Sequence, residues 1–509
     1  MESTVSERSF FGKPKLVAVL VALILLAGFG VRMIDLTDLP VDFNPTRQLF
    51  SALKARGMYY QYAANLSIPN WQKQIGIKLG QELPPIEPDV FERLVAGTYM
   101  IFGEHLWIAR IYSSIFWLLG GLALFGLARR MSSTNGAIIA LLYYVFLYFA
   151  VIASRSFQPD PLMVALTIGG FWAFYHWYEA HTWKWVIITG LLTGFAIFIK
   201  VWAAFPLFGA FAAQILFDGN LKKSIRDLQT WAVAILSALP AGIYLLFGFF
   251  IQGFLVSQTS FRFFPNLWLS GSFYIRWLNM ADNIVGSGAL LLALLGIFMA
   301  RAKDRPFMIG MWIGYIAYGL ALPYHITTHN YYQLPLIPIV ALSLAFPASA
   351  IFEKIAELGS TSAFVRYSVI AVILFAVGHA VWDARTSLLG QNSRGDAHFW
   401  AALGDKLGHT SSVVSLTSDY GYSLAYWGFQ DSTYWLGKGD VNLRDLAGKN
   451  VQPASNFDSV IAGKQYFLIT QFSAYDSDTG LKNALSNYPV YAQGSGYIIF
   501  DLQHPIKKP

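Results

Sequence analysis

The sequence contains no cysteine among its 509 residues. The chain can therefore form no disulfide, no thiolate metal site and no cysteine nucleophile. Charged residues are also scarce: they make up 13% of the chain, against about 25% in typical soluble domains. The chain also lacks a Walker phosphate loop, a dinucleotide-binding glycine fingerprint and a nucleophile elbow, which excludes the common nucleotide-binding motifs.

Apolar residues dominate what remains. The chain is 55% hydrophobic and 16% aromatic, as expected of an integral membrane protein. Crossing a bilayer as a helix takes about 20 residues, and apolar runs of roughly this length recur. These runs predict an α-helical polytopic membrane protein with about eleven transmembrane helices. They lie at 16–33, 106–128, 134–153, 161–178, 184–199, 201–217, 230–251, 286–300, 307–323, 333–352 and 366–382.

The basic residues predict an orientation. Lys and Arg in short loops accumulate on the cytoplasmic side of a membrane. If the N-terminus is inside, the inner loops carry most of the Lys and Arg, and the short outer loops carry only Arg155, Lys200, Arg262 and Arg276. We therefore expect a multi-pass protein of the inner (plasma) membrane with a cytoplasmic N-terminus and an extracytoplasmic C-terminus. The net charge of +7 is then a topology signal and does not indicate nucleic acid as a partner.

Two predicted outer segments are too long to be simple turns. The first outer loop, 34–105, is rich in polar residues and Pro, with helices expected at 46–56 and 89–102. The second, 252–285, is aromatic and suited to lie at the membrane interface. Long ordered loops of this kind are usually functional.

The composition becomes that of a soluble domain after Asp383. Short strands are expected in 411–416, 464–470 and 496–502, with a helix at 479–488 between the second and third strands. The predicted organisation is thus a transmembrane domain at 1–385, which includes the long first outer loop, and a small extracytoplasmic α/β domain at 392–509.

The stretch "VDFNPTRQLF" (41–50) places a carboxylate close to the edge of the membrane. Asn44 followed by Pro45 is a common way to begin a helix, with Asn44 as the cap. On that interpretation Asp42 is not needed for capping and is available as a general base facing a cavity. Both interpretations stay open on the local sequence.

Charged residues recur in the next two outer turns. In "SRSFQPDPLM" (154–163), Arg155 and Asp160 either form a salt bridge that fixes the turn or line a site, because ionisable groups at membrane depth are costly. In "FIKVWAAFP" (198–206), Lys200 either extends its ammonium group to the interface or serves a site.

The segment "YHITTHNYYQLPLIP" (324–338) contains two histidines four residues apart. That spacing suits metal ligands on a helix face, but no carboxylate lies in the segment, so no metal site is expected. Tyr331 and Tyr332 are interpreted as interface anchors or as hydrogen-bond donors to an anionic headgroup.

Taken in order, several segments resemble the polytopic glycosyltransferases of the C-type superfamily. The chain is similar in particular to the bacterial relatives of protein O-mannosyltransferases (glycosyltransferase family 39) and to the lipid A aminoarabinose transferases. The resemblance extends to about residue 345. It rests on "RMIDLTDLPVDFNPTRQ", "PPIEPDVFERLVAGTYMIFGEHLWIARIYSSIFWLLGGLALFGLARR", "RSFQPDPLM", "FIK" before "VWAAFP", and "HNYYQLPLIP".

The resemblance implies an enzyme that takes a sugar from a polyprenyl-phosphate carrier at the outer membrane face. It implies Asp42 as the catalytic base, and Arg47 matches the arginine that usually follows. Lys200, Tyr331 and Tyr332 match positions near the donor phosphate, and either Arg262 or Arg276 supplies a guanidinium group. The chain departs from the family pattern at Phe43, where relatives often have Glu, and at Leu83, where the aminoarabinose transferases have Lys.

The predicted function is therefore transfer of a sugar from a polyprenyl-phosphate donor to a hydroxyl acceptor, which is a glycan, a lipid or a protein. Membrane lipids are the other expected partners, and no cofactor is required. The first alternative is a lipid-linked-sugar flippase or transporter; transporters usually contain a repeat, and we find none in the sequence. A second alternative, a non-catalytic scaffold of the cell envelope, leaves Asp42, Arg155, Asp160 and Lys200 without a common purpose.

Overall fold

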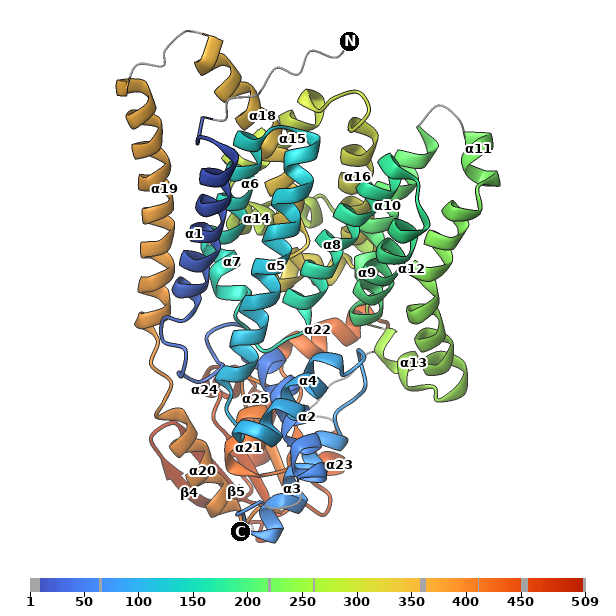
Figure 1. The fold of residues 1–509 in the computed structure, drawn as a ribbon. Coiled ribbons are helices and arrows are strands. Elements are labelled where there is room, and N and C mark those ends of the chain that lie inside the picture. Colours follow the sequence, from blue (N-terminus) through green and yellow to red (C-terminus); the bar gives the residue numbers. More distant parts are fainter. Residues whose placement is uncertain are drawn as a thin grey trace. The chain divides into compact units, whose positions relative to one another are not determined.

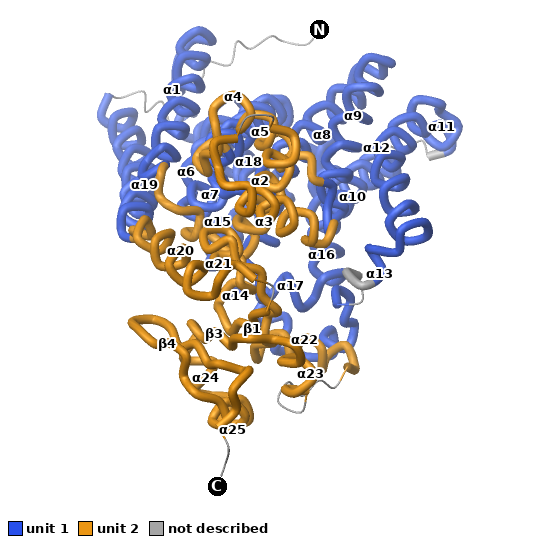
Figure 2. Tube along the Cα trace, turned by 90° about the horizontal axis from the view of Figure 1, so that it is seen from below, with its two compact units in different colours: residues 1–36, 86–88, 109–390 blue, residues 37–85, 89–108, 391–509 orange. Residues whose placement is uncertain are grey.

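The computed structural model describes residues 10–63, 66–217, 221–259, 261–357, 363–410, 412–449 and 456–506. The chain divides into two compact units (Figure 2). Unit 1 comprises residues 1–36, 86–88 and 109–390, and unit 2 comprises residues 37–85, 89–108 and 391–509. Most of the first outer loop therefore groups with the C-terminal domain, whereas the sequence placed it with the transmembrane part.

Unit 1 is a bundle of helices (Figure 1). Each of the eleven apolar runs coincides with helix, because a helix satisfies its own backbone hydrogen bonds in an apolar environment. The elements are α1 (Pro14–Arg32), α5 (Trp107–Met131), α6 (Thr134–Phe146), α7 (Tyr148–Ala153), α8 (Asp160–Ala180), α9 (Trp183–Ile199), η1 (Val201–Ala203), α10 (Ala204–Leu216), α11 (Leu221–Arg226), α12 (Leu228–Leu246), η2 (Phe247–Ile251), α13 (Phe254–Thr259), η3 (Pro265–Leu269), α14 (Gly271–Val285), α15 (Ser287–Met299), α16 (Arg305–Ala321), α17 (Pro323–Thr328), η4 (Asn330–Gln333), α18 (Leu336–Glu357) and α19 (Ala363–Gly390).

Fewer of the described helices are long enough to cross a membrane than there are apolar runs in the sequence. Within the described residues, five helices are long and apolar enough to cross a membrane, or six if the bent pair α14–α15 is one span. That pair is bent by 97°. The helices α6, α9 and η1–α10 are apolar but shorter. The structure thus confirms a multi-pass helical membrane protein, while the count of eleven spans stays a prediction.

Glycine allows two helices of unit 1 to pack closely. A Cβ atom added at Gly310 in α16 would lie 2.2 Å from the carbonyl oxygen of Gly209 in α10, and one at Gly314 would lie 2.3 Å from that of Phe205. Apolar helices in a membrane associate through such close packing of small residues. The α10–α16 pair lies beside the segment that carries the cavity described below.

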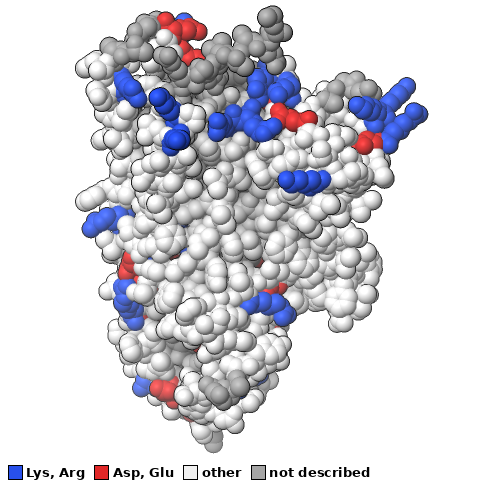
Figure 3. Space-filling view, in the orientation of Figure 1, with Lys and Arg blue, Asp and Glu red and all other residues white. Residues whose placement is uncertain are grey.

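Basic side chains gather at one end of the unit 1 helices. Figure 3 shows blue Lys and Arg side chains at the end where Figure 1 places α11, above a face that is mostly white. Arg130 and Lys303 both contact Glu179 there, and Arg301 contacts Asp304. The assignment of this end to the cytoplasm, made from the basic loops of the sequence, stays a prediction.

Unit 2 combines three helices of the first outer loop with a small α/β domain. The helices are α2 (Pro45–Tyr62), α3 (Asn70–Gln81) and α4 (Val90–Phe102), and the first and third confirm the two expected helices. The remaining elements are α20 (Asp396–Leu407), β1 (Val413–Leu416), α21 (Tyr422–Gly428), β2 (Thr433–Tyr434), α22 (Lys438–Leu446), α23 (Phe457–Ile461), β3 (Tyr466–Ile469), α24 (Phe472–Ser477), α25 (Thr479–Leu485), β4 (Val490–Gly494) and β5 (Tyr497–Asp501).

The strands form one sheet in the order β2-β1-β3-β5-β4. β2, β1 and β3 are parallel, whereas β5 is antiparallel to both β3 and β4. The three expected strands correspond to β1, β3 and β5, and the expected helix corresponds to α25. β2 and β4 were not predicted, because β2 has only two residues and β4 is largely exposed.

An ion pair ties α2 to the α/β domain inside unit 2. The Arg56 guanidinium donates to Glu104 over 2.7 Å and to the backbone carbonyl of Tyr426. It also lies 3.5 Å from the centre of the Tyr426 ring. Because these partners come from three separate parts of the sequence, the contact fixes how the first outer loop packs on α21 within this unit.

Candidate functional site

Lys200 is the centre of the candidate site in unit 1. It follows the last residue of α9 and precedes the short helix η1, with an extended backbone (φ −154°). Its side chain is only 3% exposed. The ammonium group lies 2.8 Å from Asp160 Oδ1 and 3.4 Å from Glu87 Oε1. Lys200 therefore does not extend its ammonium group into water at the membrane interface, which was one of its two interpretations.

Asp160 is the first residue of α8 and is buried. A carboxylate in the first turn is favoured there by the helix dipole, and Lys200 supplies the opposite charge. A salt bridge with Arg155 was one of the two interpretations of Asp160 that the sequence left open. Instead, Arg155 donates to the backbone carbonyls of Ile34 and Asp35, the second over 2.9 Å. Arg155 thus holds the turn before α8 against the residues that follow α1.

Two tyrosines flank the ammonium group of Lys200. Tyr331 and Tyr332 lie in η4 and are buried, and their ring centres are 5.3 Å and 5.5 Å from Lys200 Nζ. Such distances permit a cation–π attraction. Arg262 Nη1 donates to the Tyr332 hydroxyl over 3.3 Å. The predicted residues Lys200, Tyr331, Tyr332 and Arg262 are therefore brought together.

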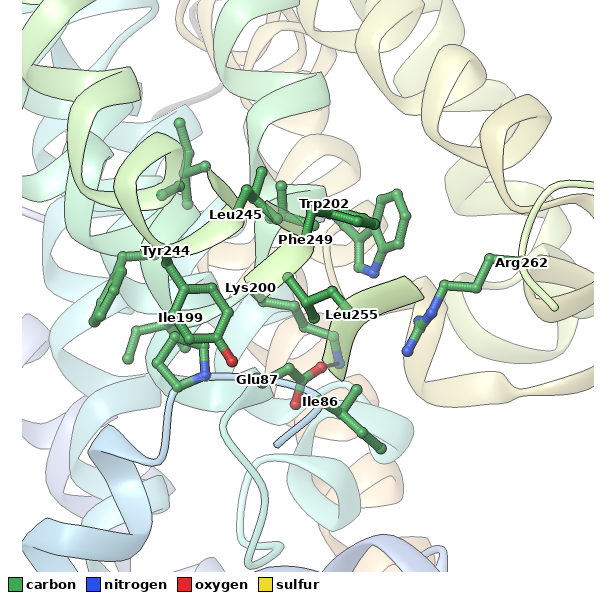
Figure 4. Close-up of a pocket in the computed structure, with 15 residues that line it drawn as sticks. Ile86, Glu87, Ile199, Lys200, Trp202, Tyr244, Leu245, Phe249, Leu255 and Arg262 are labelled. Carbon is green, nitrogen blue, oxygen red and sulfur yellow. Dashed lines mark ion pairs between the residues drawn. The ribbon is translucent and has the colours of Figure 1, made fainter. Parts of the chain in front are cut away.

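A cavity of about 240 Å³ lies beside this cluster (Figure 4). Figure 4 shows Lys200 next to Glu87, with Arg262 on the other side of Leu255. Most of the wall is apolar and comes from α9, η1, α12 and the segment around α13. The apolar lining residues are Ile86, Pro88, Ile197, Phe198, Ile199, Val201, Trp202, Ala241, Tyr244, Leu245, Phe249 and Leu255.

The two arginines that the sequence left as alternatives differ in place. Arg262 lines the cavity, and its guanidinium carbon lies 5.8 Å from the centre of the Trp202 ring. Arg276 lies in α14 and is exposed, and it is not among the residues that line the cavity. The geometry thus favours Arg262 as the cation of the later outer segment.

Asp42 and Arg47 lie in unit 2, at the start of α2. Asp42 is half-buried, and its Oδ1 accepts a hydrogen bond from Gln48 Nε2 over 3.2 Å. The same amide donates to the Phe43 carbonyl over 2.7 Å. Arg47 lies 5.6 Å from the centre of the Phe50 ring. Asp42 is therefore anchored by a neutral amide one turn into the helix.

The proposed cap of α2 is not formed as expected. α2 begins at Pro45, as the sequence suggested, but Asn44 adopts a left-handed conformation (φ 47°) and makes no side-chain capping hydrogen bond. Its carbonyl accepts from the backbone of Arg47 and Gln48 instead. Asn tolerates the left-handed region better than most residues, so its role here is to turn the chain.

The histidines of the later loop stack on one another. The His325 and His329 ring centres are 5.4 Å apart, and His325 is 5.4 Å from Tyr332. Burial, together with the neighbouring His329, Arg262 and Lys200, lowers the pKa of His325 to about 3. A neutral imidazole is thus expected at physiological pH. Within the described ranges, no group of three or more His, Cys, Asp or Glu is arranged to hold a metal ion.

Comparison with known proteins identifies a family model and solved folds that the chain resembles. Residues 87–244 match the family model of dolichyl-phosphate-mannose-protein mannosyltransferases. The fold matches ArnT from Cupriavidus metallidurans bound to undecaprenyl phosphate, with 15% identity, 96% of this chain and 98% of that chain covered, and a TM-score of 0.61. The resemblance to the C-type glycosyltransferases is confirmed.

A second C-type enzyme also shares the fold. It is the oligosaccharyltransferase AglB from Archaeoglobus fulgidus, in complex with an inhibitory peptide and a dolichol-phosphate. It is 12% identical, with 95% of this chain and 74% of that chain covered and a TM-score of 0.52. No curated protein sequence matches the chain. At these identities the structural matches establish the C-type fold and leave the substrates open.

Sequence reasoning missed Glu87 and Trp202. Glu87 belongs to "PPIEP", whose prolines predict only an extended, stiff segment, and it supplies the second carboxylate at Lys200. The available signal was a carboxylate between apolar residues and prolines, since such a group needs a partner where it becomes buried. Trp202 follows Lys200 closely, but nothing in the sequence places it beneath Arg262.

Proposed function

We propose that this protein is a membrane glycosyltransferase that transfers a sugar from a polyprenyl-phosphate donor to a hydroxyl acceptor on the outer face of the plasma membrane. The observation that carries this proposal is the cavity of unit 1, which has a mostly apolar wall and two cations, Lys200 and Arg262. A polyprenyl phosphate has the same two parts, an apolar chain and an anionic group. The fold shared with lipid-phosphate-binding C-type enzymes supports the match.

Lys200 and Arg262 are assigned different contacts with the donor phosphate. Lys200 already contacts Asp160 and Glu87, so two of its three N–H donors face carboxylates. Arg262 carries a guanidinium group, whose five donors suit a phosphate. We assign Arg262 the main phosphate contact, with Lys200 and the hydroxyls of Tyr331 and Tyr332 completing it. Asp160 positions Lys200.

The reaction requires one base and one stabilised leaving group. The acceptor hydroxyl loses its proton to Asp42 while its oxygen bonds to the anomeric carbon of the sugar. The bond from that carbon to the phosphate oxygen breaks, and the electron pair leaves with the polyprenyl phosphate, whose charge Arg262 and Lys200 balance. A direct displacement inverts the anomeric centre. Arg47 and Arg155 are assigned to positioning Asp42 and the turn before α8.

The decisive experiment mixes purified protein in lipid nanodiscs with a series of polyprenyl-phosphate sugars and measures release of polyprenyl phosphate together with glycosylated product. Transfer from at least one donor is expected, and Asp42→Asn should abolish most of it. A flippase would instead move the intact donor between leaflets of a vesicle without forming product. Translocation without transfer would overturn the proposal.

The orientation can be tested because the chain has no cysteine. A single cysteine at Lys222, which is exposed in α11, should react with an impermeant maleimide only after cells are opened. A single cysteine at Lys406, exposed in α20 of unit 2, should react in intact spheroplasts. The opposite labelling pattern would place unit 2 in the cytoplasm and end the outer-face mechanism.

A further inference from the structure

An aromatic surface in unit 2 is not used by the donor chemistry above. It consists of the exposed Tyr420 and the half-buried Tyr422 and Tyr434, and we call it the tyrosine surface; its inner end packs on the buried ring of Phe50. The centres of the Tyr420 and Tyr434 rings are 4.7 Å apart, Tyr420 and Tyr422 are 6.3 Å apart, and Tyr422 and Phe50 are 6.1 Å apart. All four residues lie within unit 2.

The backbone holds Tyr420 in a strained conformation. Tyr420 has φ 61° and is followed by Gly421 with φ 82°. A bulky residue with positive φ is an outlier that persists only where the surroundings impose it. Asp419 imposes it here, because its carboxylate accepts from the backbone N–H of Gly421 over 3.2 Å and of Ser423 over 2.8 Å. Tyr420 is 44% exposed in this conformation.

The place of this surface in the sheet is one that ligands commonly use. Tyr420 follows β1, and Tyr434 ends β2, so both lie at the carboxyl ends of parallel strands. The connection after β1 leads to β2 on one side, whereas the connection after β3 leads to β4 on the other. The change of direction therefore lies between β1 and β3, beside the end of β1 that Tyr420 follows. Open α/β sheets bind ligands at such a change of direction.

The polar groups beside the exposed Tyr420 are acidic and neutral, whereas the cations Arg47 and Lys54 lie at the buried ring of Phe50. The Tyr420 hydroxyl donates to Asp440 Oδ1 over 2.7 Å, and Asp440 Oδ2 accepts from the Gly437 backbone over 3.3 Å. A carboxylate beside the rings disfavours an anionic lipid headgroup. A peptide that adds to the sheet edge would find only the two residues of β2 to pair with.

A saccharide fits these features. The C–H face of a sugar ring can lie on an exposed aromatic ring, and its hydroxyl groups can donate to a carboxylate such as that of Asp440. We propose that the tyrosine surface binds a saccharide, so that the acceptor of this enzyme is a glycan. This inference rests on the proposed glycosyltransferase function and names its acceptor class.

The surface leads to the predicted catalytic base within the same unit. Phe50 lies on α2 and is near Arg47, and Asp42 is bound by Gln48 of that helix. Burial raises the pKa of the Tyr422 phenol to about 12, and Arg47 opposes the rise. A glycan held on the tyrosines is thus bound to the same unit that carries the carboxylate proposed to take its hydroxyl proton.

The test is saccharide binding by the full chain in nanodiscs. The probes are mannohexaose, cellohexaose and chitohexaose, with a 20-residue Ser/Thr-rich peptide as the competing acceptor class, and binding is measured by saturation-transfer NMR. The wild type should bind at least one hexasaccharide. Tyr420→Gly, which removes the ring but suits the positive φ, should weaken that binding about tenfold or more without lowering the thermal midpoint.

Three controls sharpen the result. Tyr420→Phe keeps the ring and should keep most of the affinity. Tyr491→Ala removes another exposed tyrosine of unit 2, on β4, and should have no effect. Arg262→Ala, together with competition by excess polyprenyl-phosphate sugar, should leave hexasaccharide binding intact, because no residue of the tyrosine surface lines the donor cavity.

Binding of the peptide alone, binding of no hexasaccharide, or unchanged binding by Tyr420→Gly would each overturn the inference. Displacement of the hexasaccharide by the donor lipid would assign the surface to the donor sugar and overturn it as well. The assay needs no donor turnover. If the wild-type protein binds a hexasaccharide but transfers no sugar, the result therefore counts against the proposed function and not against the tyrosine surface.

Discussion

Two lysines of the molecule have nearly the same partners and very different surroundings. Lys200 in unit 1 lies 2.8 Å from Asp160 and 3.4 Å from Glu87. Lys78 in unit 2 lies 2.9 Å from Asp431 and 3.7 Å from Glu82. The Lys200 side chain is 3% exposed, whereas that of Lys78 is 45% exposed. Water screens the second cluster, so equal distances do not mean equal energies.

This difference in exposure separates a charged cluster that needs a functional explanation from one that does not. A solvated pair such as that of Lys78 forms at little cost and contributes little. Burying Lys200 with two carboxylates costs desolvation free energy that the Coulomb attraction only partly returns. A buried cluster of this kind beside a cavity therefore points to chemistry, and four predictions test the contrast.

The largest effect is expected from a third carboxylate, Asp42, which accepts a hydrogen bond from the neutral amide of Gln48. Asp42→Asn keeps the size of the side chain but cannot accept a proton. Sugar transfer should fall by about 10²–10⁴-fold, the usual contribution of a positioned base, with donor binding and thermal midpoint near those of wild type. The measurement is the transfer rate from a matched polyprenyl-phosphate sugar, with exposed Asp405→Asn as control. A stable variant with near-normal turnover would refute Asp42 as the base and make Asp160 the next candidate.

The second prediction compares the two lysines directly. Lys200→Met leaves Asp160 and Glu87 without their cation in a buried place, which should destabilise unit 1 by roughly 3–5 kcal/mol. Lys78→Met should cost about 0–1 kcal/mol. Thermal midpoints in the same detergent give the comparison. Equal shifts for both variants would mean that the Lys200 cluster is hydrated. Its charges would then give no argument for a functional site.

The same contrast explains how much the sequence could predict. The apolar runs predicted the helices of unit 1 because backbone hydrogen bonding and hydropathy are local properties. Lys200, Tyr331 and Tyr332 could be selected because charged and polar residues are conspicuous in short apolar turns. The strands β1, β3 and β5 followed from their apolar pattern, whereas the exposed β4 carries no such pattern.

Partners distant in the sequence could not be predicted. Nothing near Asp160 indicates that Lys200 and not Arg155 is its partner, since the pairing depends on how α8 packs against α9. Glu87 reaches Lys200 from a segment whose prolines predict only stiffness. The left-handed backbone of Tyr420 depends on hydrogen bonds that the Asp419 carboxylate accepts from the backbone of Gly421 and Ser423, and the sequence signals only the Gly that follows. Packing decides these features, and packing is not local.

The third prediction concerns a buried carboxyl without a direct cation, Glu92 of α4. Its Oε1 accepts from Ser51 over 2.7 Å. Burial raises the pKa of Glu92 from 4.5 to about 7, with the Ser51 hydrogen bond opposing the rise. Between these values the folded state holds a proton that the unfolded state has lost, so stability falls as pH rises from 4.5 to 7, by on the order of 3 kcal/mol at most.

Thermal midpoints at pH 5 and pH 8 measure this effect. Glu92→Gln should reduce the difference between the two midpoints and raise the midpoint at pH 8. The exposed Glu82→Gln is the matched control and should leave the pH dependence unchanged. A Glu92→Gln profile that follows the wild type would mean that the carboxyl is ionised and solvated at both pH values.

The smallest effect is expected at the donor phosphate, where the chain offers a matched pair of arginines. Arg262 lines the cavity and donates to Tyr332, whereas Arg276 is exposed on α14. A charge-assisted contact to phosphate contributes about 1.5–3 kcal/mol, which corresponds to roughly 10–150-fold in affinity. Arg262→Ala should weaken binding of a polyprenyl phosphate by that factor, and Arg276→Ala should not change it.

Arg262→Lys should recover only part of the loss, because an ammonium group cannot reproduce the two parallel hydrogen bonds of a guanidinium. Microscale thermophoresis with a fluorescent polyprenyl phosphate measures all three variants. If Arg276→Ala weakens binding and Arg262→Ala does not, the phosphate lies outside the cavity, and Lys200 with its two carboxylates would be a structural cluster after all.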